Sequence, residues 1–227
     1  MYINLHVHTN RGSKSDSIAK IPELVKRAKE LGQKSLAITD HGNTQGWFQF
    51  SKHCEKHGIK PIFGVEAYEA ASFDGRKRGR DLLGGDNLHS LLLAKNEEGK
   101  QAIRDLLIYA NQKGNKFAGE GRYDLEWLLA NKEKFKGNVI WSNACLGGRV
   151  AQLLKSDRFK EALNYVDQMT DIFGKDNVKI EYQNHKLMYN EKPLVNNGLY
   201  KIATELGVDA FFGPDVHYVN KGDKNLR

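Results

Sequence analysis

The sequence has little cysteine: only Cys54 and Cys145 occur among its 227 residues. Disulfide frameworks are typical of exported proteins, and the opening MYINLHVH shows no basic segment followed by an apolar core. We therefore expect no signal peptide, a cytoplasmic location and two free thiols. Apolar runs are short as well, and none approaches the roughly 20 residues of a membrane-spanning helix. No contact with a membrane is expected.

Acidic residues are too few to balance the basic ones, because 28 Asp and Glu stand against 35 Lys and Arg, for a formal net charge of +7. A positive field favours anionic partners, with nucleic acid as the first candidate. A solvated lysine-rich surface without a ligand is the alternative, and charge alone does not separate the two. The length suits a single domain over residues 1–227 with a sizeable buried core.

Apolar segments typical of strands alternate with segments of helical period. Strands are expected at 2–6, 34–39, 61–66, 89–94, 138–142, 178–183 and 209–213. Between them, segments such as IPELVKRAKELG repeat apolar residues every three or four positions and stop at a glycine. This alternation predicts an α/β fold with a parallel sheet, and seven evenly spaced strands favour a distorted, closed (β/α)7 barrel.

Two polar, glycine-rich and basic segments interrupt the alternation, at about 72–88 and 112–124. Both are expected to be surface loops inserted into the single domain. The basic residues of these two segments that could contact nucleic acid are Arg76, Lys77, Arg78, Arg80 and Arg122. A basic loop beside an active site can follow a DNA backbone, whereas a solvated loop without a ligand is an equal alternative.

Side chains of the metal-binding types follow strand after strand. In HVH, His6 and His8 would share one face of a strand, because residues i and i+2 point the same way. The later candidates are Asp40, His41, Glu66, His89, Cys145, His185, Asp215 and His217. Taken alone, HVH is a weak signal for a metal site, and two half-exposed polar residues in a loop are the alternative. Because the C-terminal ends of barrel strands meet at one rim, however, six of the seven strands would bring a candidate ligand there.

The donor types restrict the metal and the chemistry. Imidazole with carboxylate and thiolate suits Zn²⁺, Mn²⁺ or Fe²⁺ better than Mg²⁺. The candidates are too many for one four-coordinate ion, and they fit two or three ions that share a bridging carboxylate. Clustered divalent ions serve phosphoester hydrolysis, since they activate water and hold phosphate oxygens. No serine or cysteine nucleophile motif is evident, so a metal-dependent phosphoesterase is predicted.

The order of motifs, HxH, TDHG, GVE, a histidine before LLLAK, SNACLGG and PDVHY, resembles the polymerase and histidinol phosphatase (PHP) family. Within it, the chain is similar to the PHP domains of bacterial DNA polymerase III alpha subunits, from Tyr2 to about Asp223. The resemblance implies a distorted seven-stranded barrel with three divalent metal ions at the C-terminal rim. It also implies phosphoester hydrolysis, which in replicases can be a 3′–5′ exonuclease activity.

The resemblance further implies site residues. Carried over by motif, the three ions have these ligands: His6, His8, Glu66 and Asp215; Glu66, His89 and Cys145; Asp16, His41 and His217. The set is complete, which favours activity. The candidate catalytic residues are Glu66, Asp215 and His185, although His185 lies outside the family's metal set and equally serves as a strand-end cap. Asp40 is expected to orient a ligand histidine, and Tyr218 to stack on a base or pack beneath the site.

Three functions are open. The first is a metal-dependent DNA nuclease of 3′–5′ exonuclease type, and the second is a small-molecule phosphomonoesterase of histidinol-phosphatase type. The third is a non-catalytic replicase module, stabilised by metals, that docks a polymerase or another replisome subunit. The chain has no room for a palm domain, so no polymerase activity is expected from these 227 residues.

Overall fold

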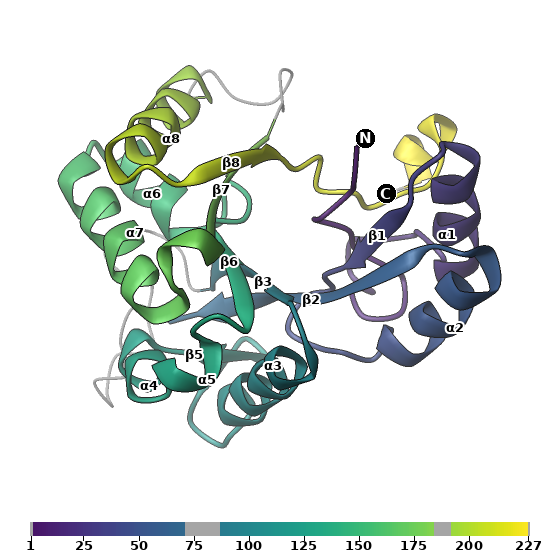
Figure 1. Ribbon diagram of the computed structural model, residues 1–227, viewed down its shortest axis with the longest axis horizontal. Coiled ribbons are helices and arrows are strands. Elements are labelled where there is room, and N and C mark those ends of the chain that lie inside the picture. The colour runs from purple at the N-terminus through teal and green to yellow at the C-terminus, as the bar shows by residue number, and fades with distance from the viewer. Residues whose placement is uncertain (1, 71–86, 184–191, 227) are drawn as a thin grey trace.

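Alternating helices and strands make up the computed structural model, which describes residues 2–70, 87–183 and 192–226 (Figure 1). The strands are β1 (Ser35–Ile38), β2 (Lys60–Glu69), β3 (Leu88–Ala94), β4 (Lys116–Phe117), β5 (Glu120–Tyr123), β6 (Val139–Ser142), β7 (Val178–Tyr182) and β8 (Asp209–Phe212). The α-helices are α1 (Ile21–Glu30), α2 (Trp47–His57), α3 (Glu97–Ala110), α4 (Leu125–Ala130), α5 (Lys132–Phe135), α6 (Arg149–Lys155), α7 (Phe159–Phe173) and α8 (Lys192–Leu206). The 3₁₀ helices are η1 (Lys175–Asn177) and η2 (Lys221–Leu226).

Local sequence signals place the first helices. Helix α1 carries a proline in its first turn, where the missing N–H costs nothing, and it buries the predicted apolar face. Helix α2 ends at Gly58, whose left-handed conformation (φ 64°) lets its N–H bond to carbonyls of the last turn. The glycine stop signals in the sequence are thus confirmed for α2.

The sheet is mixed rather than parallel. Its strand order is β4-β5-β2-β3-β6-β7-β8, with β1 paired to β2. Strand β3 runs antiparallel to both β2 and β6, whereas the β1–β2, β6–β7 and β7–β8 pairs are parallel. The all-parallel prediction was therefore wrong at β3, because no helix of the described residues crosses over between β2 and β3. Reversal of β3 brings its first residues, including His89, beside the C-terminal ends of the parallel strands.

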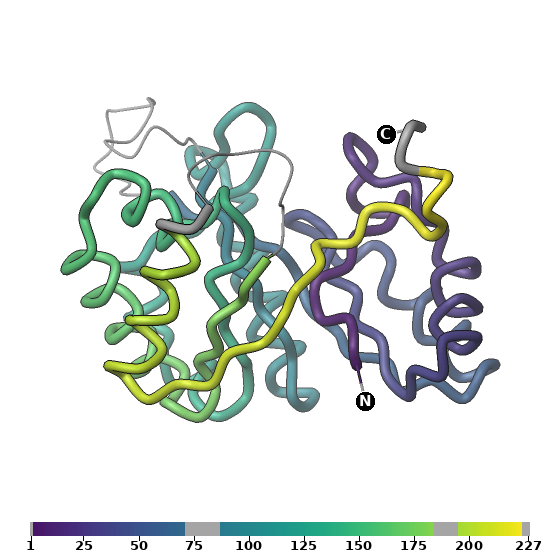
Figure 2. The backbone as a smooth tube through the Cα atoms, turned by 90° about the horizontal axis from the view of Figure 1, so that it is seen from above, coloured from purple at the N-terminus to yellow at the C-terminus, as the bar shows by residue number. Residues whose placement is uncertain are grey.

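The predicted closed barrel of seven strands was also wrong, since the described residues form eight strands whose ladder is not closed. Residues 2–6, expected as a strand, form no ladder. Instead residues 4–8 make isolated backbone hydrogen bonds on both sides. Asn4 O and Val7 O accept from Ala37 N and Thr39 N (3.0 and 2.8 Å), while His8 N donates to Val216 O (2.8 Å) and His6 O accepts from Val216 N (3.0 Å). Figures 1 and 2 show this N-terminal segment between β1 and the chain that follows β8. The irregular N-terminal segment therefore connects β1 to the chain that follows β8.

The segment at 112–124, predicted as a loop, forms a hairpin of β4 and β5. Ala118 and Gly119 both have positive φ at its turn (50° and 88°), which suits a tight hairpin. Strand β5 then pairs with β2 at Tyr68 and Arg122. Strands this short carry too few residues to show an alternating pattern, so the sequence did not reveal them. Most of the other predicted loop, 72–88, lies outside the described residues.

Helices lie around the outside of the sheet, with α1 and α2 beside β1 and β2, and α6, α7 and α8 beside β6, β7 and β8 (Figure 1). The buried core includes large side chains such as Trp141, Phe50 and Phe173. Within the described residues, no helix has the length and apolarity needed to cross a bilayer. One group of buried polar side chains surrounds the N-terminal segment, and this group forms the candidate site.

Candidate metal centre

Glu66 lies at the centre of a cluster of histidines. Its side chain is almost fully buried in β2, which continues past it to Glu69 rather than ending there as predicted. Oε1 of Glu66 is 2.9 Å from Nδ1 of His89 and 3.4 Å from Nε2 of His6. Oε2 is 2.9 Å from Nδ1 of His41 and 3.4 Å from Nε2 of His8. One carboxylate thus contacts four imidazoles, as a bridging ligand would.

His6 and His8 face each other across a short distance, with Nε2 atoms 3.1 Å apart. Both side chains are fully buried in the irregular N-terminal segment. Oδ1 of Asp215 lies 3.5 Å from Nε2 of His6 and 3.3 Å from Nε2 of His8. Asp215 adopts a left-handed conformation (φ 51°) after β8, which only a minority of non-glycine residues do. The three donors therefore converge on one point.

The outer nitrogens of these two rings are occupied. Nδ1–H of His6 donates to Glu181 Oε1 (2.8 Å). The Ser13 hydroxyl gives its single hydrogen to Asp40 Oδ1 (2.9 Å), so its oxygen accepts from Nδ1–H of His8 (2.9 Å) and from the His41 N–H (3.1 Å). When each ring carries a hydrogen on Nδ1 alone, its Nε2 lone pair faces Asp215.

Such an arrangement fits a cation. Two lone pairs and two carboxylates at these distances repel one another unless a proton or a metal ion lies among them. Three groups of donor atoms each lie within 4.8 Å of one another: His6, His8 and Asp215; His8, His41 and Glu66; Glu66, His89 and Cys145. Seven of the nine predicted ligands belong to these groups.

Asp16 and His217 adjoin the same groups. Nε2–H of His41 donates to Asp16 Oδ2 (2.9 Å), and Nε2–H of His217 donates to Asp215 Oδ1 (2.9 Å). Nδ1 of His217 lies 3.6 Å from Asp16 and forms no hydrogen bond there among the described residues. All nine predicted ligands are thus contiguous, and their imidazole, carboxylate and thiol donors suit divalent ions of the zinc, manganese or iron type.

The protonation pattern of the metal-free protein shows how strongly the cluster attracts positive charge. Burial opposes protonation of His6, but the carboxylates of Glu181, Asp215 and Glu66 outweigh it and raise the His6 pKa well above its usual value. Burial likewise opposes protonation of His41, yet Asp16 and Glu66 raise its pKa to about 10. In His8, burial wins and lowers the pKa to about 4. A bound cation would replace these protons.

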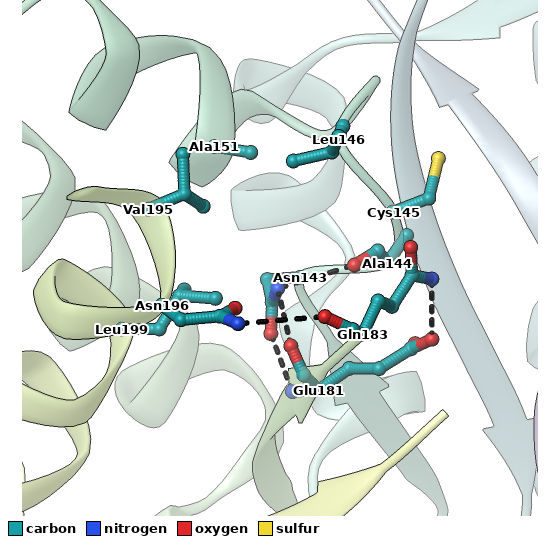
Figure 3. A pocket seen from close by; sticks show the side chains of 10 residues that line it. All are labelled: Asn143, Ala144, Cys145, Leu146, Ala151, Glu181, Gln183, Val195, Asn196 and Leu199. Carbon is teal, nitrogen blue, oxygen red and sulfur yellow. Dashed lines mark hydrogen bonds between the residues drawn. The ribbon is translucent and has the colours of Figure 1, made fainter. Parts of the chain in front are cut away.

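Cys145 follows β6 and offers a thiol to the group around Glu66. Its Sγ lies 3.4 Å from Nδ1 of His89 and accepts from the Gly147 N–H. Burial is the main cause that raises the Cys145 pKa, so the thiol is protonated unless a metal takes the thiolate. Figure 3 shows Cys145 beside a cavity of about 10 Å³ that Glu181 also lines. That volume holds about one water and no nucleotide.

Several contacts were missed by sequence reasoning. Glu181 sits in β7 with no motif around it, and an acidic residue inside an apolar strand was its only signal. Ser13 is one polar residue among several in its loop, so nothing distinguished it. Asp40, predicted to orient a histidine, reaches His8 only through Ser13 and also accepts from the N–H and hydroxyl of Thr9 (2.6 and 2.7 Å). Tyr68 stacks on His41, with centroids 5.7 Å apart.

The structure describes only two of the residues predicted to contact nucleic acid. Arg122 is largely buried in β5, with its guanidinium carbon 4.9 Å from the Phe117 ring centre, and it is not the exposed cation expected of a loop. Tyr218 is half-buried beside His217. The other candidates lie outside the described residues: His185, Arg76, Lys77, Arg78 and Arg80.

Comparisons with known proteins agree with this geometry. The family model of the PHP domain matches residues 4–185. The DNA polymerase III subunit alpha of Borreliella burgdorferi is 37% identical over 222 residues, which are 98% of this chain and 18% of that protein. The corresponding subunit of Thermus aquaticus is 39% identical over 226 residues, with the same coverage of 98% and 18%. The chain thus spans less than a fifth of these relatives.

One solved structure shares the fold at low identity. Histidinol phosphate phosphatase from Lactococcus lactis, in complex with zinc, L-histidinol and phosphate, superposes with a TM-score of 0.52. The two sequences are 16% identical, and the match covers 96% of this chain and 87% of that one. This likeness concerns the fold alone.

Proposed function

The chain belongs to the PHP domain family, and on that premise we propose that it is a metal-dependent phosphoesterase acting on the 3′ end of DNA. The observation that carries this proposal is the convergence of the His6 and His8 lone pairs with Asp215 and Glu66, all within 3.5 Å contacts. No protein nucleophile is required, because metal-activated water supplies the attacking group in such sites.

Three sets of residues would hold divalent ions: His6, His8, Glu66 and Asp215; Glu66, His89 and Cys145; Asp16, His41 and His217. Ions bound there lower the pKa of a coordinated water and neutralise charge on the phosphate. The chain's own residues prepare the site: Glu181 and Ser13 fix the tautomers of His6 and His8. Asp215, which contacts His217, would be the candidate to accept a proton from a coordinated water.

Two observations support DNA as the substrate. The net charge of +7 favours a polyanion, and the relatives named above are DNA polymerase subunits. The same relatives support a proposed attachment to a replicase or another replisome component. Polymerisation is not proposed, because the chain covers only 18% of either relative.

The test is shortening of labelled DNA. Purified chain with verified Mn²⁺ or Zn²⁺ content is incubated with 5′-labelled single strands and with duplexes that carry a 3′ mismatch. We expect stepwise shortening from the 3′ end, abolished by EDTA and by Asp215→Asn. The matched control is Asp209→Asn, an exposed aspartate of β8 outside the cluster, which should keep full activity. Intact DNA with bound metal verified would reject the proposal.

Other results would identify the alternatives. Turnover of a phosphomonoester such as L-histidinol phosphate, with DNA left intact, would indicate a small-molecule phosphatase. A metal-loaded protein without either activity, in which Asp215→Asn merely lowers the melting temperature, would indicate a structural replicase module.

A further inference from the structure

A groove outside the metal centre runs between α2 and α3. It consists of two adjoining hollows of about 320 and 450 Å³ that share Thr44 and Arg104. The first hollow is lined by Trp47 and Phe48 of α2, and the second by Gly42 and by Ile108 of α3. We call this feature, defined by these six residues, the α2–α3 groove.

The groove begins where the metal centre ends. Gly42 directly follows His41, and its N–H donates to the backbone carbonyl of Glu66 (2.9 Å). The side-chain amide of Asn43 donates to the carbonyls of Gly12 and His41 (2.9 and 2.7 Å). These bonds fix Gly42 and Asn43, which line the second hollow, relative to the candidate metal ligands His41 and Glu66. A chain that leaves the cluster on this side therefore meets the groove next.

Aromatic and cationic side chains alternate along the first hollow. Trp47 and Phe63 pack with ring centroids 5.3 Å apart, and the Phe48 side chain next to them is 77% exposed. Lys100 Nζ lies 4.3 Å from the Phe63 centroid, and the Arg104 guanidinium carbon lies 5.5 Å from that of Trp47. An exposed ring beside cations is the arrangement that stacks a base and contacts its phosphate.

The charge of the groove favours a polyanion over an apolar peptide. Lys100 and Arg104 line it, and no aspartate or glutamate does so among the described residues. Lys100 pairs with Glu97 (2.6 Å), whereas Arg104 forms no ion pair within the described ranges. Helix α2 also starts here without a side-chain cap, so its first N–H groups add positive potential.

We propose that the α2–α3 groove binds single-stranded nucleic acid adjoining the metal centre, with Phe48 stacking on a base and Arg104 contacting a phosphate. This inference deepens the proposed function, since the groove would hold the strand whose end is hydrolysed. Binding itself needs no hydrolysis, so the two proposals can fail separately.

The experiment measures fluorescence anisotropy of a labelled oligothymidylate of about 12 nucleotides, a length within the range that such surfaces cover. The protein is kept in EDTA so that the strand stays intact. We expect Phe48→Ala to weaken binding about fivefold or more, and Arg104→Gln to weaken it and to lower the salt dependence by about one phosphate contact. Both side chains are exposed, so the variants should melt like the parent protein.

Matched controls come from α8, which lies across the molecule from α2 (Figure 1). Tyr200→Ala removes an equally exposed ring (66%), and Lys201→Gln removes an exposed cation. The proposal is overturned if these controls weaken binding as much as the groove variants, or if the groove variants bind like the parent. Unchanged DNA binding, with loss of association to a polymerase fragment, would assign the groove to a protein partner instead.

Two further outcomes separate the groove from the metal centre. Groove-dependent binding by a metal-loaded protein that hydrolyses nothing would support the groove and reject the proposed function. DNA hydrolysis that Phe48→Ala and Arg104→Gln leave unchanged, with unchanged affinity, would reject the groove alone.

Discussion

Nδ1 of His6 lies 2.8 Å from Oε1 of Glu181, and both side chains are fully buried. Glu181 is itself held in place: Gln183 Nε2 donates to the same oxygen (2.7 Å), and the Asn143 side chain bonds to both the N–H and the C=O of Glu181 (2.7 and 3.2 Å). A carboxylate behind a ligand histidine fixes its tautomer and raises its basicity. If His6 holds a metal ion, Glu181 would therefore act on that ion through His6.

The first prediction concerns this carboxylate. Glu181→Gln keeps the size of the side chain and removes its charge, so we expect metal affinity to fall by about 10- to 100-fold. Competition with a chromogenic zinc chelator measures the change without any assay of activity. Glu161→Gln on α7 serves as the control, because that carboxylate pairs with Arg158 at the surface. Equal affinity of the two variants would show that Glu181 has no such role.

The second prediction tests Ser13. Ser13→Ala leaves Asp40, His8 and the His41 N–H each without one buried hydrogen-bond partner. We expect a loss of about 1–3 kcal/mol in the free energy of unfolding, measured by urea titration of the metal-free protein. Ser156→Ala removes an exposed hydroxyl that bonds within its own helix, and it should cost far less. Similar losses in both variants would contradict the role given to Ser13.

The third prediction uses a glycine. A Cβ added to Gly213 would lie 2.1 Å from Oε1 of Glu181, so Gly213→Ala must displace the carboxylate behind His6. We expect weaker metal binding and a stability loss of about 1–3 kcal/mol. Gly222→Ala, where no atom lies within 4 Å, is the control. In a Glu181→Ala background, Gly213→Ala should cause a smaller loss of stability, because the carboxylate that it displaces is gone. An equal loss in both backgrounds would show that the added methyl group clashes with another residue.

The fourth prediction separates the two thiols. Burial raises the pKa of Cys54 to about 12, and its side chain is inaccessible, so alkylation by iodoacetamide should stay negligible from pH 7 to pH 10. Burial raises the pKa of Cys145 as well, but its side chain is only half-buried, so Cys145 should react faster than Cys54 in metal-free protein, and Zn²⁺ should protect it. Peptide mass spectrometry measures the alkylation of Cys54 and Cys145 in the same sample. Labelling of Cys145 that zinc does not change would argue against thiolate coordination.

The sequence indicated the candidate ligands better than it indicated the strands that carry them. Spacing placed His6 beside His8, and motifs after successive strands indicated Glu66, Cys145 and Asp215. The rule that parallel strands end at one edge accounts for the positions of Cys145 after β6 and Asp215 after β8, but not for Glu66, because β2 continues past it to Glu69. The strand predicted at 2–6 failed because periodicity does not show whether a neighbouring strand offers a ladder. The direction of β3 was predicted wrongly because the period of apolar residues does not show which way a strand runs.

Glu181 and Ser13 could not be predicted for a different reason. Their roles depend on partners far away in sequence, since Glu181 is 175 residues from His6 and Ser13 is 27 from Asp40. A local pattern records the type of a residue and its neighbours along the chain. It does not record which buried oxygen a hydroxyl will meet, so residues that orient ligands become visible only once the fold is known.

Hydrogen bonds from His8 N–H to Val216 O (2.8 Å) and from Val216 N–H to His6 O (3.0 Å) join the beginning of the described chain to the segment after β8. The Ser17 hydroxyl reinforces this junction, because it lies within hydrogen-bonding distance of the carbonyls of both His8 and His217 (2.9 and 3.0 Å). Ligands on either side of this junction belong to one cluster. Such contacts form late, because they close the largest loop of the chain. Capture of a metal ion should thus report complete folding, and a fragment ending before residue 213 should acquire helices and most strands yet hold no ion at this junction.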